Sequence, residues 1–292
     1  MGGKKLYVKS IYMGDIIRKF HVINVVFCPK SNHNQTEKYL TAFEDMCSKN
    51  IMVALQGSRA KDQKSGAVSL FESIGDGVYH GQFQEGIRFK SNTTAYDTTS
   101  QSLVPAGVNP DFLYNPFTID FWFIPERHRL ILRKQDSLKS FIKFLQEALL
   151  YVASGVDDVI LTIVKSIDAI EEIFSSTAIK KLEVDIAYTN NDSNTSASLL
   201  IDEMLKSSNA KRSKFSLIAE DDAYIDILSN EFARGYLELS RNNGVATATI
   251  YDEDAEKIRK ISTDETPEVF EMTIPENSEP NAQDFRNLID SK

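Results

Sequence analysis

A length of 292 residues, a hydrophobic fraction of 42% and a net charge of −9 describe a chain that can bury a sizeable core. This composition excludes a chain that is disordered throughout, because many apolar residues are available to offset conformational entropy. The sequence contains no run of about 20 apolar residues, the length that a membrane-spanning helix needs, so we expect no membrane association. The chain has only two cysteines, Cys28 and Cys47, which is an unusual disulfide framework for a secreted protein of this size. We therefore expect reduced thiols and a cytoplasmic location.

The negative charge is concentrated at the C-terminal end. Residues 251–292 carry 12 acidic and 5 basic side chains, whereas residues 1–250 carry 30 and 28. The main body is therefore nearly neutral, which argues against a global electrostatic field that attracts nucleic acid.

The N-terminal third alternates between strand-like and helical patterns. Runs rich in Val, Ile, Tyr and Phe predict strands over 6–17 and 20–27. Apolar residues at helical spacing predict a helix over 36–49, and a strand follows over 51–55. Residues 68–74 and 78–89 are then predicted as two strands joined by a Gly-Asp-Gly turn.

Residues 91–109 form a polar, Thr-rich segment that is long for a connection inside a compact domain. Segments of this kind are often lids, binding loops or mobile segments. A hairpin is predicted next, from strands over 117–124 and 129–132, and two helices are predicted over 138–152 and 156–174.

The C-terminal half begins with a predicted β-α-β unit. Its strand, helix and strand span 182–188, 196–206 and 215–219, with a right-handed crossover if the strands are parallel neighbours. A helix is predicted over 223–234. Asn243-Gly244 between strand-like runs predicts a hairpin of 235–239 and 245–251.

Strands over 258–262 and 269–274 would continue this hairpin as a β-meander. The fold class is therefore α+β: mostly antiparallel sheets with packed helices, plus a C-terminal β-α-β unit and β-meander. We predict an N-terminal domain over 1–153, a C-terminal α+β domain over 154–275 and a disordered acidic tail over 276–292.

No recognised catalytic motif occurs. The chain lacks a dinucleotide fingerprint, a Walker loop and a Gly-x-Ser-x-Gly elbow. Its four histidines and two cysteines do not have metal-ligand spacing, so we predict no catalytic residue, no metal and no cofactor. The missing motifs argue against an enzyme but do not exclude one.

One group of acids invites a nuclease interpretation, namely Asp111, Asp120, Glu126 and nearby His128. Asp120 lies within an apolar strand and, on a period of two, shares a face with Thr118 and Trp122. The simpler interpretation is a partly exposed face of an antiparallel sheet.

Two basic clusters are candidates for phosphate contacts. Their members are Arg127, Arg129, Arg133 and Lys134 on the predicted hairpin, and Lys206, Lys211, Arg212 and Lys214 before a later strand. A solvated strand edge that discourages aggregation explains the same residues.

Two stretches carry a family resemblance. The segments 115–130, which reads NPFTIDFWFIPERHRL, and 235–248, which begins GYLELS, resemble bacterial proteins that occur near phage-defence genes. Those proteins are distantly similar to the RexA phage-exclusion protein. The resemblance implies a role in phage exclusion and an association with nucleic acid, and it supplies no catalytic residues.

Three functional hypotheses follow. The first is a non-enzymatic sensor or partner-binding protein of a bacterial anti-phage defence or toxin-type system, with a protein partner or a homo-oligomer. The second is a nucleic-acid-binding protein that uses the two basic clusters. The third is a nuclease whose carboxylates assemble only in the fold.

Overall fold

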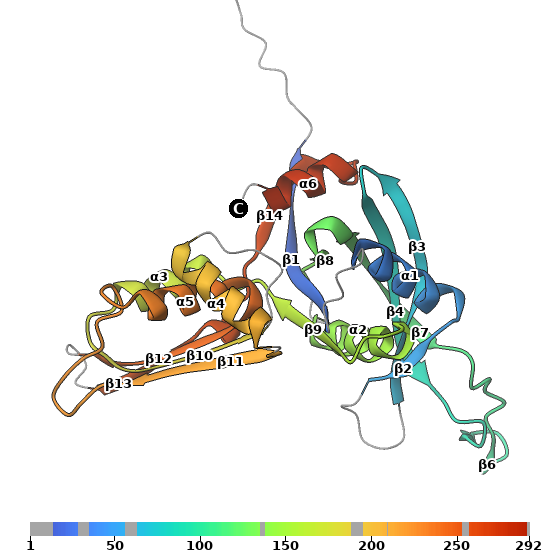
Figure 1. Cartoon of the computed structure of the whole chain (residues 1–292). Coiled ribbons are helices and arrows are strands. Elements are labelled where there is room, and N and C mark those ends of the chain that lie inside the picture. Colours follow the sequence, from blue (N-terminus) through green and yellow to red (C-terminus); the bar gives the residue numbers. More distant parts are fainter. Residues whose placement is uncertain are drawn as a thin grey trace, which may run out of the picture.

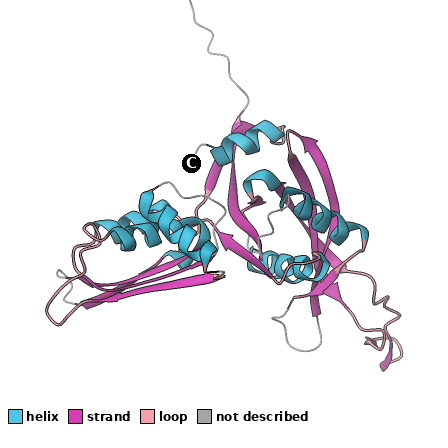
Figure 2. Cartoon of the chain, in the orientation of Figure 1, coloured by secondary structure: helices cyan, strands magenta, loops and turns pink. Residues whose placement is uncertain are grey.

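The computed structural model describes residues 14–28, 35–55, 63–134, 138–187, 195–208, 210–252 and 257–290. These residues form two larger antiparallel sheets, each with helices packed on it, and one small two-stranded sheet (Figures 1 and 2). The predicted α+β class is confirmed. Within the described ranges, no helix is both long and apolar enough to cross a membrane.

The first sheet has the strand order β14-β1-β8-β7-β4-β3-β2, and β9 also pairs with β1. Its strands are β1 (Asp15–Cys28), β2 (Met52–Ala54), β3 (Gln63–Gly75), β4 (Val78–Arg88), β7 (Tyr114–Ile124), β8 (Arg129–Arg133), β9 (Asp158–Ile163) and β14 (Phe270–Pro275). Strand β1 organises the sheet, because its first half pairs with β14 and its second half with β9.

Helices α1 (Gln35–Ser48) and α2 (Leu138–Val152) pack against one face of this sheet, which curves around them (Figure 1). The apolar stripe of α1 buries Tyr39, Phe43 and Met46, as the helical spacing predicts. Phe43 stacks on Phe123 of β7 with ring centroids 4.7 Å apart. Aromatic packing of this kind fixes the first core.

The second sheet has the order β11-β10-β12-β13, and its helices also lie on one face (Figure 1). Its strands are β10 (Ile179–Ala187), β11 (Arg212–Ile218), β12 (Gly244–Asp252) and β13 (Lys257–Ser262), and its helices are α3 (Ile167–Ser175), α4 (Ser196–Ser207) and α5 (Glu231–Asn243). Strands β10 and β11 are antiparallel, so the predicted strand-helix-strand unit contains no parallel crossover.

Three predicted elements differ from the structure, and one of them is the helix over 223–234, since α5 begins only at Glu231. The predicted helix over 156–174 is strand β9 followed by α3, because Ser166 caps a new helix by accepting a hydrogen bond from the Asp168 amide. The predicted hairpin at Asn243-Gly244 is wrong, since α5 continues to Asn243 and is capped by Asn230 at its start. Gly244 is needed for a different reason: a Cβ there would lie 2.1 Å from the carbonyl oxygen of Asp185.

The predicted disordered tail is also wrong for the described residues. Helix α6 (Ala282–Asp290) packs on the first sheet, on the face opposite α1 and α2. Phe285 is fully buried there between Trp122 and Phe20. Strands β9 and β14 lie within the predicted domain 154–275 but belong to the first sheet. The first sheet is therefore built from segments on both sides of the second sheet in the chain. Of the first predicted strand, 6–17, residues 6–13 lie outside the described residues.

A buried polar network joins the two sheets. Arg129 of β8 donates to Asn24 of β1 at 2.5 Å, and Asn24 donates to Asn243 of α5 at 2.7 Å. His21 lies beside this network with its Nδ1 3.1 Å from the Glu268 carbonyl oxygen, and burial lowers the pKa of its imidazole. A lowered pKa favours the neutral imidazole at pH 7.

Candidate functional site

Helix α6 covers only part of the outer face of the first sheet, and the remainder is polar. Neighbouring residues on β4 and β7 pair directly across this face, as His80 with Trp122, Gln82 with Asp120, and Gln84 with Thr118. Directly opposed residues project from the same side of a sheet. The predicted common face of Thr118, Asp120 and Trp122 is therefore confirmed.

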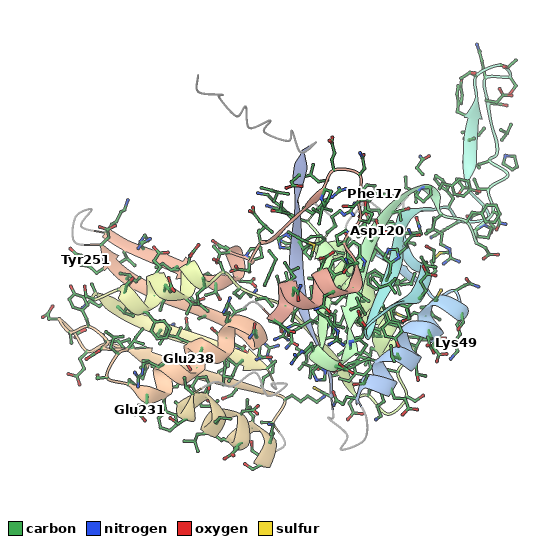
Figure 3. All side chains as sticks on the ribbon, turned by 90° about the horizontal axis from the view of Figure 1, so that it is seen from above. Lys49, Phe117, Asp120, Glu231, Glu238 and Tyr251 are labelled. Carbon is green, nitrogen blue, oxygen red and sulfur yellow. The ribbon has the colours of Figure 1, made fainter. Side chains whose placement is uncertain are left out.

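Hydrogen bonds tie this polar face together near Asp120, which is labelled in Figure 3. His80 Nε2 lies 3.0 Å from the Asp120 carboxylate, and Gln82 donates to the same oxygen at 3.2 Å. The His80 ring also stacks on Trp122. Asp120 therefore has two side-chain partners, which explains how a carboxylate is tolerated within an apolar strand.

The candidate nuclease group does not assemble. His128 lies toward the first core, where its Nδ1 is 3.1 Å from the Tyr39 hydroxyl. Glu126 pairs with Arg286 of α6, and Asp111 lies in a loop before β7. Across the described ranges, no three His, Cys, Asp or Glu side chains gather closely enough to hold a metal ion. The nuclease hypothesis thus has no carboxylate cluster to support it in this part of the chain.

A two-stranded arm projects from the sheet where β4 ends and β7 begins (Figure 1). It consists of β5 (Thr94–Asp97) and β6 (Ser102–Pro105), which pair only with each other. Tyr96 and Leu103 oppose each other across the arm and are 61% and 72% exposed. The arm therefore presents an apolar pair that nothing in the described chain covers.

The root of the arm is held by specific contacts. Arg88 donates through Nε to the Pro110 carbonyl oxygen at 2.6 Å, and the Asn109 amide donates to the Tyr114 hydroxyl at 2.8 Å. Phe89 packs edge-on against Tyr114 with ring centroids 5.2 Å apart. These contacts fix the direction in which the arm leaves the body.

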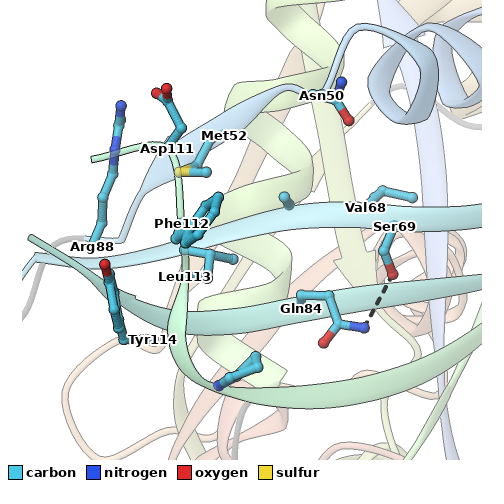
Figure 4. Close-up of a pocket in the computed structure, with 12 residues that line it drawn as sticks. Asn50, Met52, Val68, Ser69, Gln84, Arg88, Asp111, Phe112, Leu113 and Tyr114 are labelled. Atoms are coloured by element: carbon cyan, nitrogen blue, oxygen red, sulfur yellow. Dashed lines mark hydrogen bonds between the residues drawn. The ribbon is translucent and has the colours of Figure 1, made fainter. Parts of the chain in front are cut away.

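A pocket of about 780 Å³ opens at this root (Figure 4). Its walls come from the β2–β4 edge of the first sheet and from the loop that leads into β7. The lining residues are Asn50, Met52, Ala67, Val68, Ser69, Gln84, Arg88, Asp111, Phe112, Leu113, Tyr114 and Pro116. Its size and its mixture of apolar and polar groups are typical of binding pockets.

Arg88 is the principal charged donor of this pocket. It is half-buried, and one guanidinium nitrogen is occupied by the Pro110 carbonyl. No carboxylate among the described residues lies within ion-pair distance of it, although Asp111 shares the pocket (Figure 4). Phe112 is 58% exposed at the same place. The pocket thus offers a cation beside uncovered apolar surface.

The first predicted basic cluster is largely engaged within the chain. Arg127 pairs with Asp290 at 3.0 Å, and Arg133 pairs with Glu279 at 2.8 Å. Arg129 is only 8% exposed and belongs to the joint between the sheets. Lys134 is exposed. The acidic C-terminal segment therefore neutralises much of the basic surface that the sequence indicated.

The second predicted basic cluster lies on a different sheet and is also paired. Arg212 and Lys214 of β11 both contact the carboxylate of Asp185, and Lys206 pairs with Asp202 on the same helix. Lys211 is exposed. At least five of the eight predicted residues thus form ion pairs, so nucleic-acid binding by these clusters stays a prediction.

The length of 91–109 indicated a lid, a binding loop or a mobile segment, and nothing in the sequence indicated the pocket beside it. Met52, Arg88 and Phe112 come from separate segments and meet only through strand pairing. Two large apolar residues in this Thr- and Ser-rich stretch, Tyr96 and Leu103, are a local signal that points to the arm.

Together these features define a two-sheet α+β protein with a projecting arm, which is held at its root by hydrogen bonds and aromatic packing, and an adjoining pocket. The chain belongs to the family described as "Domain of unknown function (DUF4747)", whose model matches residues 16–290. No curated protein is significantly similar to it.

Proposed function

We propose that this protein is a non-enzymatic partner-binding protein, and that its arm and the adjoining pocket form the binding surface. The single observation that carries the proposal is the uncovered Tyr96–Leu103 pair on an arm whose root is fixed. A two-stranded hairpin is marginally stable alone in water, because it has little surface to bury. Contact with a partner would supply the missing burial.

The fixed root makes the arm suited to binding. Arg88, Tyr114 and Phe89 hold it before any partner arrives. A root that is ordered before binding limits the conformational entropy that the marginally stable hairpin loses when a partner binds. The open polar face around Asp120 offers further hydrogen-bonding groups beside the pocket.

The biological setting is a separate part of the proposal. The resemblance of residues 115–130 and 235–248 to proteins near phage-defence genes favours a partner within a bacterial anti-phage defence or toxin-type system. A cytoplasmic location fits such a role and stays a prediction.

Replacing Leu103 with aspartate is expected to abolish stable partner capture, because it places a charge in the centre of the apolar contact. Native affinity capture followed by quantitative mass spectrometry would compare the wild type, Leu103→Asp and Ile218→Asp. Ile218 is 74% exposed at the end of β11, so its substitution matches the chemistry at a distant site. Equal capture by all three proteins would contradict the proposal.

A further inference from the structure

We propose that the occupant of this surface is a second copy of the chain, with each arm lying in the pocket of the other copy. This inference rests on the proposed function, because it names the partner of the same arm and pocket. It requires that one chain carries two surfaces that complement each other, and the arm and the pocket meet this requirement.

The first complementarity is apolar. The arm presents Tyr96 and Leu103 on one face, and the pocket presents Met52 and Phe112. Both surfaces are uncovered within one copy. The arm projects away from the body in Figure 1, so its own pocket does not receive it. Bringing the two surfaces together between copies would remove both from water.

The second complementarity is electrostatic. Asp97 is the only charged residue between 91 and 110, and it lies beside Tyr96. Hydrogen bonds from the Ser100 hydroxyl and the Thr99 amide lower the pKa of its carboxyl, so it is ionised at neutral pH. Arg88 in the pocket forms no ion pair among the described residues. An inserted arm would bring an anion toward this cation.

The position of the two surfaces allows a closed pair. The arm leaves the body at residues that directly follow Arg88 and directly precede Asp111, and both of these line the pocket. A two-fold axis midway between the Tyr96–Leu103 pair and the pocket would place each arm over the other copy's pocket. Such an exchange uses every contact twice and stops at two copies.

Sedimentation equilibrium of the full chain at micromolar concentrations tests this arrangement. The wild type is expected at twice the 32.9 kDa chain mass. Leu103→Asp on the arm and Phe112→Asp in the pocket are each expected to raise the dimer dissociation constant about tenfold or more, as loss of an interface hot spot does. Ile218→Asp is expected to leave it unchanged.

Mixing the two variants provides the sharper result. A Leu103→Asp copy keeps its pocket and a Phe112→Asp copy keeps its arm, so the pair retains one intact contact of two. Mixtures are expected to form heterodimers more tightly than either variant forms homodimers. Both positions are largely exposed in one copy, and circular dichroism would verify that the variants fold.

Two results would overturn the inference: a wild-type monomer over the whole concentration range, or a dimer that neither variant weakens. A monomeric wild type whose capture of a different protein still depends on Leu103 would overturn the self-association and leave the proposed function standing. Loss of both behaviours would overturn both.

Discussion

Replacing Phe285 with alanine is expected to lower the free energy of unfolding by about 3–5 kcal/mol, the usual cost of removing a buried phenylalanine ring. Phe285 is fully buried, stacks on Trp122 at 4.4 Å and meets Phe20 edge-on at 5.8 Å. Those contacts anchor α6, so the substitution removes the main apolar contact of the C-terminal helix. The loss is a large part of the stability that a protein typically has.

Urea unfolding followed by circular dichroism and by fluorescence measures this loss. Trp122 is the only tryptophan, so fluorescence reports directly from the affected contact. Gln283→Ala is the matched control, since Gln283 is exposed on the same helix and its loss should change stability by no more than about 0.5 kcal/mol. Equal stability of the two variants would mean that α6 does not pack on the sheet.

Replacing Arg129 with alanine is expected to lower the free energy of unfolding by about 3 kcal/mol, because it removes a buried charged donor from a hydrogen-bonded network. Arg129 donates to Asn24, and Asn24 in turn donates to Asn243 of the second sheet's helix layer. The variant therefore weakens the joint between the two sheets.

Arg127→Ala is the control for this second prediction. Arg127 is two positions away, and its ion pair with Asp290 is about half exposed on both sides. Exposed pairs of this kind contribute about 0–1 kcal/mol. A stable Arg129→Ala protein that instead bound nucleic acid less tightly would favour the phosphate-contact interpretation of this arginine over the structural one.

Much of the fold could be predicted where the signal is local. The spacing of Tyr39, Phe43 and Met46 is sufficient for α1, and the alternation around Asp120 is sufficient for its strand face. The prediction of one helix over 156–174 was wrong because a run of Val and Ile at mixed spacing fits a strand as well as a helix. The prediction of a hairpin at Asn243-Gly244 was wrong because Gly244 allows close packing against β10 and does not form a turn.

The C-terminal helix α6 depends on packing partners that are distant in the sequence, so a local pattern does not predict it. Residues 276–292 are polar and acidic, a composition typical of disorder. Yet Ala282, Phe285 and Leu288 fall on one helical face, and Trp122 and Phe20 supply the surface that this face needs. The helix is stabilised by residues more than 160 positions earlier in the chain, which a local pattern cannot reveal.

The candidate site was predictable only in part for the same reason. The unusual length of 91–109 indicated a lid, a binding loop or a mobile segment, and Tyr96 and Leu103 within it are visible in the sequence. The pocket requires the β2–β3 pairing that brings Met52 opposite Ala67, and it requires the turn before β7. The basic clusters were visible, but their acidic partners in the C-terminal segment and in β10 became evident only from the fold.

Hydrogen exchange of the arm tests most directly whether it is a docking element. An uncovered hairpin opens easily, so the amides of 94–105 should exchange rapidly in dilute protein. We predict that they gain protection as the concentration rises or a partner is added, and that Leu103→Asp removes this gain. Arm amides that exchange at one rate under all these conditions would contradict the account.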